Sequence, residues 1–131
     1  MTQATNTMSS TGPKSGENAR LWLIKLITGP FILIVILVHF VVNHALSSTG
    51  LLNYSDVVAY YQNWVVPIME ILFLALVVTH SLLGLRSIIL DLHPSRGALK
   101  TIDWVFAIVG IVAFIYGTWL ILVIVRQGMA S

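Results

Sequence analysis

Three long apolar segments dominate the chain, at about residues 21–45, 65–90 and 103–125, with polar stretches between them. A helix needs roughly 20 residues to cross about 30 Å of hydrocarbon, so each segment is long enough to span a membrane. The pattern therefore predicts an all-α integral membrane protein with three transmembrane helices in an up-down-up bundle.

The transmembrane domain is expected to cover residues 21–126, between a polar tail at 1–20 and a short tail at 127–131. The first apolar run is too long for a cleaved signal peptide, and no small-x-small cleavage site closes it. Thr101 is predicted to cap the third helix, with Asp103 near the positive end of that helix.

Composition supports the membrane interpretation. The chain is 57% hydrophobic and 9% charged, and its mean hydropathy is +0.91. Soluble domains carry about 25% charged residues, so a water-soluble fold is excluded. The absence of cysteine excludes disulfides, thiolate metal sites and covalently attached c-type haem. The four histidines are then the main chemical resource of the chain.

The basic residues predict the orientation of the bundle. The loop at 45–64 contains no Lys or Arg, and Arg126 stands alone at the far end. The other six flank the first helix or the second loop: Lys14, Arg20, Lys25, Arg86, Arg96 and Lys100. By the positive-inside rule, the N-terminus and the 91–103 loop face the cytoplasm. We therefore expect a multi-pass protein of the cell inner (cytoplasmic) membrane, with no nucleic-acid partner.

A histidine lies inside the second apolar segment, at His80. Titratable groups in a membrane helix are costly and point to function. Two readings are open, an interhelical hydrogen bond and a haem ligand. Gly84 lies one turn later on the same face and leaves room for a flat macrocycle, which favours the ligand. Arg86 could neutralise haem propionates, and Asp91 could receive or relay a proton.

His39 is a second candidate ligand, with a polar packing contact as its alternative. It follows Lys25 by 14 residues, about 21 Å along a helix, whereas His80 precedes Arg86 by 6, about 9 Å. The two histidines are thus expected at different depths and are not expected to share an iron. If both are ligands, each needs a histidine from another chain.

The other polar residues of the spans have simpler interpretations. Glu70 is expected to hydrogen-bond a partner helix, with a haem propionate or a proton path as alternatives. Snorkelling to headgroups is favoured for Lys25. His44 lies about 140° round the helix from His39, so it cannot serve the same ligand face. Small residues typical of close helix packing form a stripe at Gly110, Ala113 and Gly117.

The motif His80-x-x-x-Gly84-x-Arg86-x-x-x-x-Asp91 resembles the anchor subunits of succinate dehydrogenase and fumarate reductase, respiratory complex II. The segment Val38-His39-Phe40-Val41-Val42-Asn43 is similar to the first-helix histidine segment of the two-haem anchors. Tyr116-Gly117 resembles the single-haem anchors. The likeness covers about residues 20–125.

The resemblance implies a non-catalytic subunit that anchors the flavoprotein and iron–sulfur subunits and couples them to membrane quinone. It implies that His80 and His39 are axial ligands of two haems b, with Gly84 and Arg86 beside the cofactor. A second membrane anchor subunit would supply the other ligands. A single haem on His80, or a structural or transporter-associated protein without haem, are the alternative readings.

The quinone site of this family is matched less closely. Leu92 stands where similar anchors often carry a tyrosine. The Arg-x-Ser/Thr-Gly pattern of the first helix appears as Lys25-Leu26-Ile27-Thr28-Gly29, displaced by one. The candidates for quinone contact on this chain are therefore Asp91, His93 and Lys25.

Overall fold

The computed structural model describes residues 17–41 and 53–130. This part of the chain forms four helices and no strand: α1 (Ala19–Phe40), α2 (Tyr54–Tyr60), α3 (Val65–Leu90) and α4 (Arg96–Ala130). Helices α1, α3 and α4 are each long and apolar enough to cross a membrane, which confirms the prediction of an all-helical protein with three spans. His44 lies outside the described residues.

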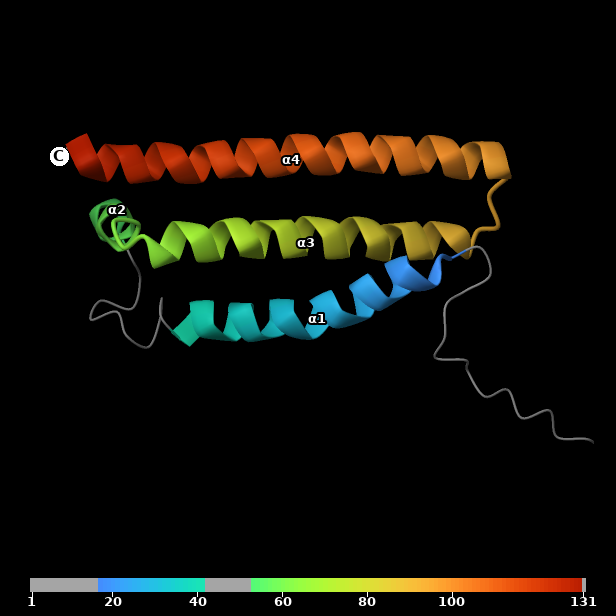
Figure 1. The fold of residues 1–131 in the computed structure, drawn as a ribbon, viewed down its shortest axis with the longest axis horizontal. Helices are drawn as coiled ribbons and strands as arrows, with labels where there is room; N and C mark the ends of the chain where they lie inside the picture. Colours follow the sequence, from blue (N-terminus) through green and yellow to red (C-terminus); the bar gives the residue numbers. More distant parts are fainter. Residues whose placement is uncertain (1–16, 42–52, 131) are drawn as a thin grey trace, which may run out of the picture.

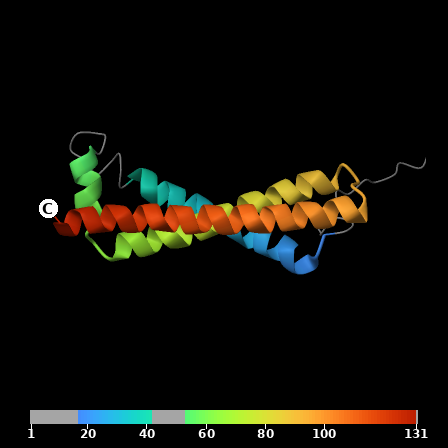
Figure 2. The same ribbon diagram turned by 90° about the horizontal axis from the view of Figure 1, so that it is seen from above.

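Helix α3 lies between the other two long helices and packs against both (Figure 1). One end of the bundle holds the start of α1, the end of α3 and the start of α4, and we call it the loop end. The opposite end holds α2, and we call it the α2 end. Seen from above, α1 and α3 cross beneath α4 (Figure 2). Pro30, which has no N–H, lies inside α1, and the first half of α1 inclines toward α3 (Figure 1).

Helix α4 is longer than predicted at both ends. It begins at Arg96, where the Ser95 hydroxyl accepts a hydrogen bond from the Ala98 N–H at 3.2 Å. Ser95 therefore caps this helix, and the prediction of a cap at Thr101 is wrong. The Thr101 hydroxyl instead donates to the Gly97 carbonyl at 3.2 Å, as threonines inside helices do.

The short helix α2 was not expected, because its seven residues are too few to show the repeat of apolar positions that is typical of a helix. A capping box starts it, in which Asn53 and Asp56 satisfy each other's backbone N–H groups. The Tyr54 hydroxyl donates to Gln127, and Gln62 Nε2 donates to the Val125 carbonyl at 3.4 Å. These bonds attach α2 and the turn after it to the final turns of α4.

Small residues bring α3 and α4 close together, as the stripe in α4 predicted. A Cβ at Gly110 would lie 2.9 Å from Leu82 Cδ1, and one at Gly117 would lie 2.5 Å from Leu74 Cδ2. Val66 is the only buried apolar residue in the part of the chain that the structure describes. Most apolar side chains thus face outward, to lipid or to another subunit, and close backbone packing joins these two helices.

Replacing Gly117 by valine should destabilise the α3–α4 pair by about 1–3 kcal/mol, because the added carbons would overlap the Leu74 side chain. Unfolding of the purified protein in detergent or bicelles would measure the loss. Gly97→Ala is the matched control, since a Cβ there meets no atom within 4 Å. Equal stability of the two variants would contradict this account of the seam.

Candidate functional site

His80 points from α3 toward the middle of α1. Its Nδ1 atom lies 3.0 Å from the hydroxyl of Thr28, which is buried at 7% exposure. A Cβ at Gly29 would come within 3.3 Å of His80 Cε1, so the imidazole packs directly on the α1 backbone. The Thr28-Gly29 pair therefore holds the ring through one hydrogen bond and one close contact.

The hydrogen bonds of Thr28 favour one tautomer of His80. The Thr28 hydroxyl has one proton, which it donates to the Ile24 carbonyl at 2.8 Å. In that arrangement the hydroxyl accepts from Nδ1–H, and the neutral imidazole leaves the Nε2 lone pair free. Nε2 has no hydrogen-bond partner among the described residues, and an unprotonated Nε2 of this kind can ligate a metal.

His39 lies on α1 against the first turns of α3. Its Nδ1 atom is 3.4 Å from Glu70 Oε1, and its ring stacks on Phe73 with centroids 6.2 Å apart. Glu70 thus contacts a neighbouring helix of its own chain. Tyr61 lies at the same end of the bundle. Burial and, to a lesser extent, the charge of Glu70 raise its pKa to about 12, so this phenol stays protonated.

The two histidines occupy different levels of the bundle. His80 is level with Thr28, and His39 lies 11 residues further along α1, about 16 Å. On α3, the partner of His39 is Glu70, which lies 10 residues before His80, about 15 Å. The two histidines therefore lie too far apart along the bundle to face one iron, as their spacing in the sequence predicted.

The residues around His80 and His39 are compatible with a haem that takes one histidine of this chain at each site. No group of three or more His, Asp or Glu side chains that could hold a metal ion occurs in the described ranges. A haem is held through axial ligands to its iron, so one imidazole from this chain would suffice at each site. A Cβ at Gly84, one turn beyond His80, would meet nothing within 4 Å, so this face of α3 is open beside the histidine.

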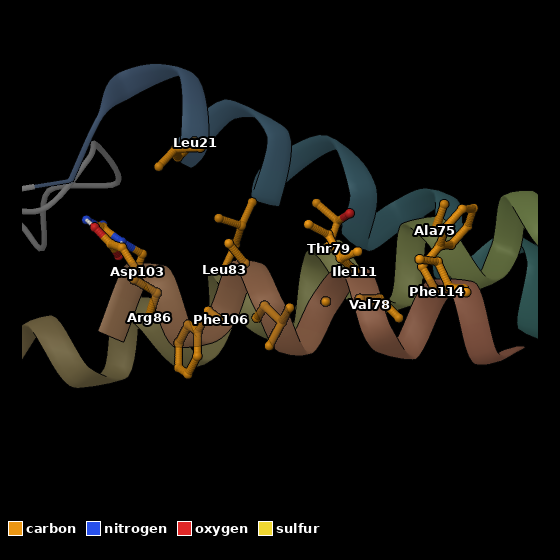
Figure 3. A pocket seen from close by; sticks show the side chains of 14 residues that line it. Leu21, Ala75, Val78, Thr79, Leu83, Arg86, Asp103, Phe106, Ile111 and Phe114 are labelled. Carbon is orange, nitrogen blue, oxygen red and sulfur yellow. Dashed lines mark hydrogen bonds and ion pairs between the residues drawn. The ribbon is translucent and has the colours of Figure 1, made fainter. Parts of the chain in front are cut away.

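Arg86 forms a bidentate ion pair with Asp103 of α4. Its Nε and Nη2 atoms lie 2.6 and 3.2 Å from the two carboxylate oxygens. The pair lies at one end of an apolar groove of about 600 Å³ between α3 and α4, which Leu21 of α1 also lines (Figure 3). Arg86 therefore already has an anionic partner within the chain, and a contact with a haem propionate remains a prediction.

Lys25 does not snorkel to headgroups, contrary to the sequence interpretation. Its ammonium group lies 2.7 Å from Glu17 Oε1 and also donates to the Ser87 hydroxyl. Ser87 in turn donates to Glu17 at 2.8 Å. Glu17 supplies a counter-charge at 5% exposure of its side chain, which keeps Lys25 in the seam between α1 and α3. Residue 17 had been assigned to the polar tail.

The other quinone candidates lie close to the end of α3. Asp91 is the C-terminal cap of this helix and is exposed. His93 is exposed and has a positive φ of 52°, which turns the chain toward Pro94 and α4. Lys25, Asp91 and His93 therefore all belong to the loop end.

Sequence reasoning missed three residues that shape this region: Thr28, Glu17 and Ser87. Thr28 was noted only as part of a displaced motif, and its contact with His80 depends on how two helices cross. Glu17 and Ser87 lie 70 residues apart, and no periodic pattern links them.

Comparisons with known proteins agree with the earlier resemblance. The family model described as the succinate dehydrogenase/fumarate reductase transmembrane subunit matches residues 11–117. A curated relative is the succinate dehydrogenase hydrophobic membrane anchor subunit of Archaeoglobus fulgidus. It is 28% identical over 100 residues, which cover 76% of this chain and 85% of the relative. No solved structure matches the chain significantly.

Proposed function

The chain belongs to the succinate dehydrogenase/fumarate reductase transmembrane subunit family, and we propose that it binds two haems b together with a second anchor chain. His80 and His39 each supply one axial ligand, and Gly84 leaves room for the macrocycle near His80. The partner anchor supplies the opposite ligands. When bound, the haems supply one-electron transfer between the iron–sulfur subunit and membrane quinone.

One observation carries this proposal. In both candidate histidines, the Nδ1 atom faces a polar group of the same chain. This group is the Thr28 hydroxyl for His80 and the Glu70 carboxylate for His39. Histidines that ligate metals typically use their other ring nitrogen in this way, which fixes the tautomer and the ring orientation. A histidine that served only to join helices would not need to leave Nε2 without a partner.

The charge pattern gives the proposed placement in the complex. The loop end carries Lys25, Arg86, Arg96 and Lys100, so the positive-inside rule places it at the cytoplasmic face of the inner membrane. The iron–sulfur and flavoprotein subunits then dock at that face. Quinone reaches the same end, where Lys25, Asp91 and His93 are the candidate contacts. Succinate–fumarate chemistry belongs to the partner subunits.

Absorbance spectroscopy of the purified complex tests the proposed function. We expect b-type bands that sharpen on reduction by dithionite, with two haems per copy of this chain by pyridine haemochrome assay. One haem per copy would overturn the two-haem version in favour of the single-haem alternative. A complex without any reducible b-type band would overturn the haem proposal itself.

A further inference from the structure

Glu70 is a carboxylate inside an apolar helix, and its surroundings are unusual. Its side chain is 13% exposed, and Oε1 is buried without a regular hydrogen bond in the described part of the chain. The buried Nδ1 of His39 also lacks one, and the two atoms face each other at 3.4 Å. Carboxylates at membrane depth are costly, so one whose buried Oε1 atom faces the Nδ1 atom of His39 calls for a functional explanation.

The ring of His39 is held from two directions. Phe73 stacks on it at an interplanar angle of 26°, which limits tilting of the ring. Glu70 lies three residues before Phe73 on α3, so both side chains project from the same face. With Nδ1 turned to Glu70, Nε2 points to the opposite edge of the ring. Helix α3 therefore sets both the plane and the rotation of an imidazole that belongs to α1.

We propose that Glu70 is a positioning residue for haem binding by His39, accepting the Nδ1–H proton in a hydrogen bond and presenting Nε2 to the iron. This inference rests on the proposed role of His39 as a ligand. A carboxylate behind a ligating histidine makes the imidazole a stronger donor, which stabilises ferric over ferrous iron. His80 differs because a neutral hydroxyl, that of Thr28, stands behind it.

The two sites therefore respond to different substitutions. Removing the negative charge behind His39 raises the midpoint potential of the haem held there, while the haem held by His80 keeps its potential. A packing role for Glu70 predicts no change in either midpoint potential on replacement by glutamine, because glutamine has nearly the same shape. A change confined to one of two haems thus separates positioning from a general loss of structure.

The test uses Glu70→Gln and Glu70→Leu in the assembled complex, followed by redox titration, EPR of the ferric haems and haem quantification. We expect Glu70→Gln to keep both haems, because the amide oxygen still accepts from Nδ1–H, and to raise one midpoint potential. We expect Glu70→Leu to weaken haem binding at the same site by about 10–100-fold, as loss of such supporting contacts does. EPR should show an altered signal for that haem alone.

Thr118→Val is the matched control, since Thr118 carries another buried polar oxygen without a partner in the described residues. It should leave both haems at their parental potentials. Parental haem content, potentials and EPR in both Glu70 variants would overturn the positioning role. If His39→Leu removes one haem in that case, only the positioning role fails. If His39→Leu keeps both haems, the proposed ligand itself is wrong.

Discussion

Replacing His80 by leucine should remove one of the two haems from the assembled complex and leave the haem held by His39. Leucine has a similar volume and suits the apolar helix, so α3 should still form and pack against α4. Leucine has no nitrogen to ligate iron. The Thr28 hydroxyl loses its contact with His80 but still donates to the Ile24 carbonyl, and no new charge is buried. Pyridine haemochrome quantification and reduced-minus-oxidised spectra would measure the expected halving of haem content.

The reciprocal variant, His39→Leu, is the control for this experiment. It should remove the other haem, and the two variants should lose different components of the redox titration because their histidines occupy different levels of the bundle. Two variants that lost the same component would mean that both histidines serve one haem. Retention of both haems in His80→Leu would exclude His80 as a ligand.

Thr28→Val should weaken haem binding at the His80 site by about 10–100-fold, although Thr28 touches no cofactor in this proposal. Valine has nearly the shape of threonine but cannot accept the Nδ1–H proton of His80. The ring then loses the bond that fixes its tautomer, and Nε2 is protonated in a larger share of molecules. Titration of haem into the haem-depleted complex would measure the change in affinity.

Thr28→Ser is the rescue variant, because it restores a hydroxyl that can donate to Ile24 and accept from His80. It should return haem affinity close to the parental value. If Thr28→Val and Thr28→Ser bound haem equally well, the hydrogen bond to His80 would have no part in ligand geometry. The contact with Gly29 would then be sufficient to hold the ring.

The two histidines are held in the same arrangement but by different chemical groups, a hydroxyl for His80 and a carboxylate for His39. Each ring sits between α1 and α3, and the helix that does not carry the histidine supplies the group behind Nδ1. The crossing of α1 and α3 is therefore what sets both imidazoles in place. Helix α4 contributes to packing through Gly110 and Gly117 and to charge pairing through Asp103, but it touches neither histidine in any contact described above.

The sequence alone determined the three spans, their apolar character and the two histidines at different depths. These features follow from segment length and from the rise of a helix, which are local properties. It also indicated the small-residue seam of α4, because Gly110 and Gly117 recur on one face. The bounds of α3, Val65–Leu90, agree with the predicted 65–90, because this predominantly apolar segment lies between the polar residues Asn63 and Asp91.

Only the tertiary structure decided which groups face the Nδ1 atoms of the histidines and which partners the charged side chains have. Thr28 meets His80, Glu70 meets His39 and Glu17 meets Lys25 because α1 crosses α3 in one particular register. Residues 52 positions apart, such as Thr28 and His80, carry no shared periodicity that a single sequence could reveal. The pairing depends on the angle and offset of two helices, and side-chain packing across the whole interface sets both.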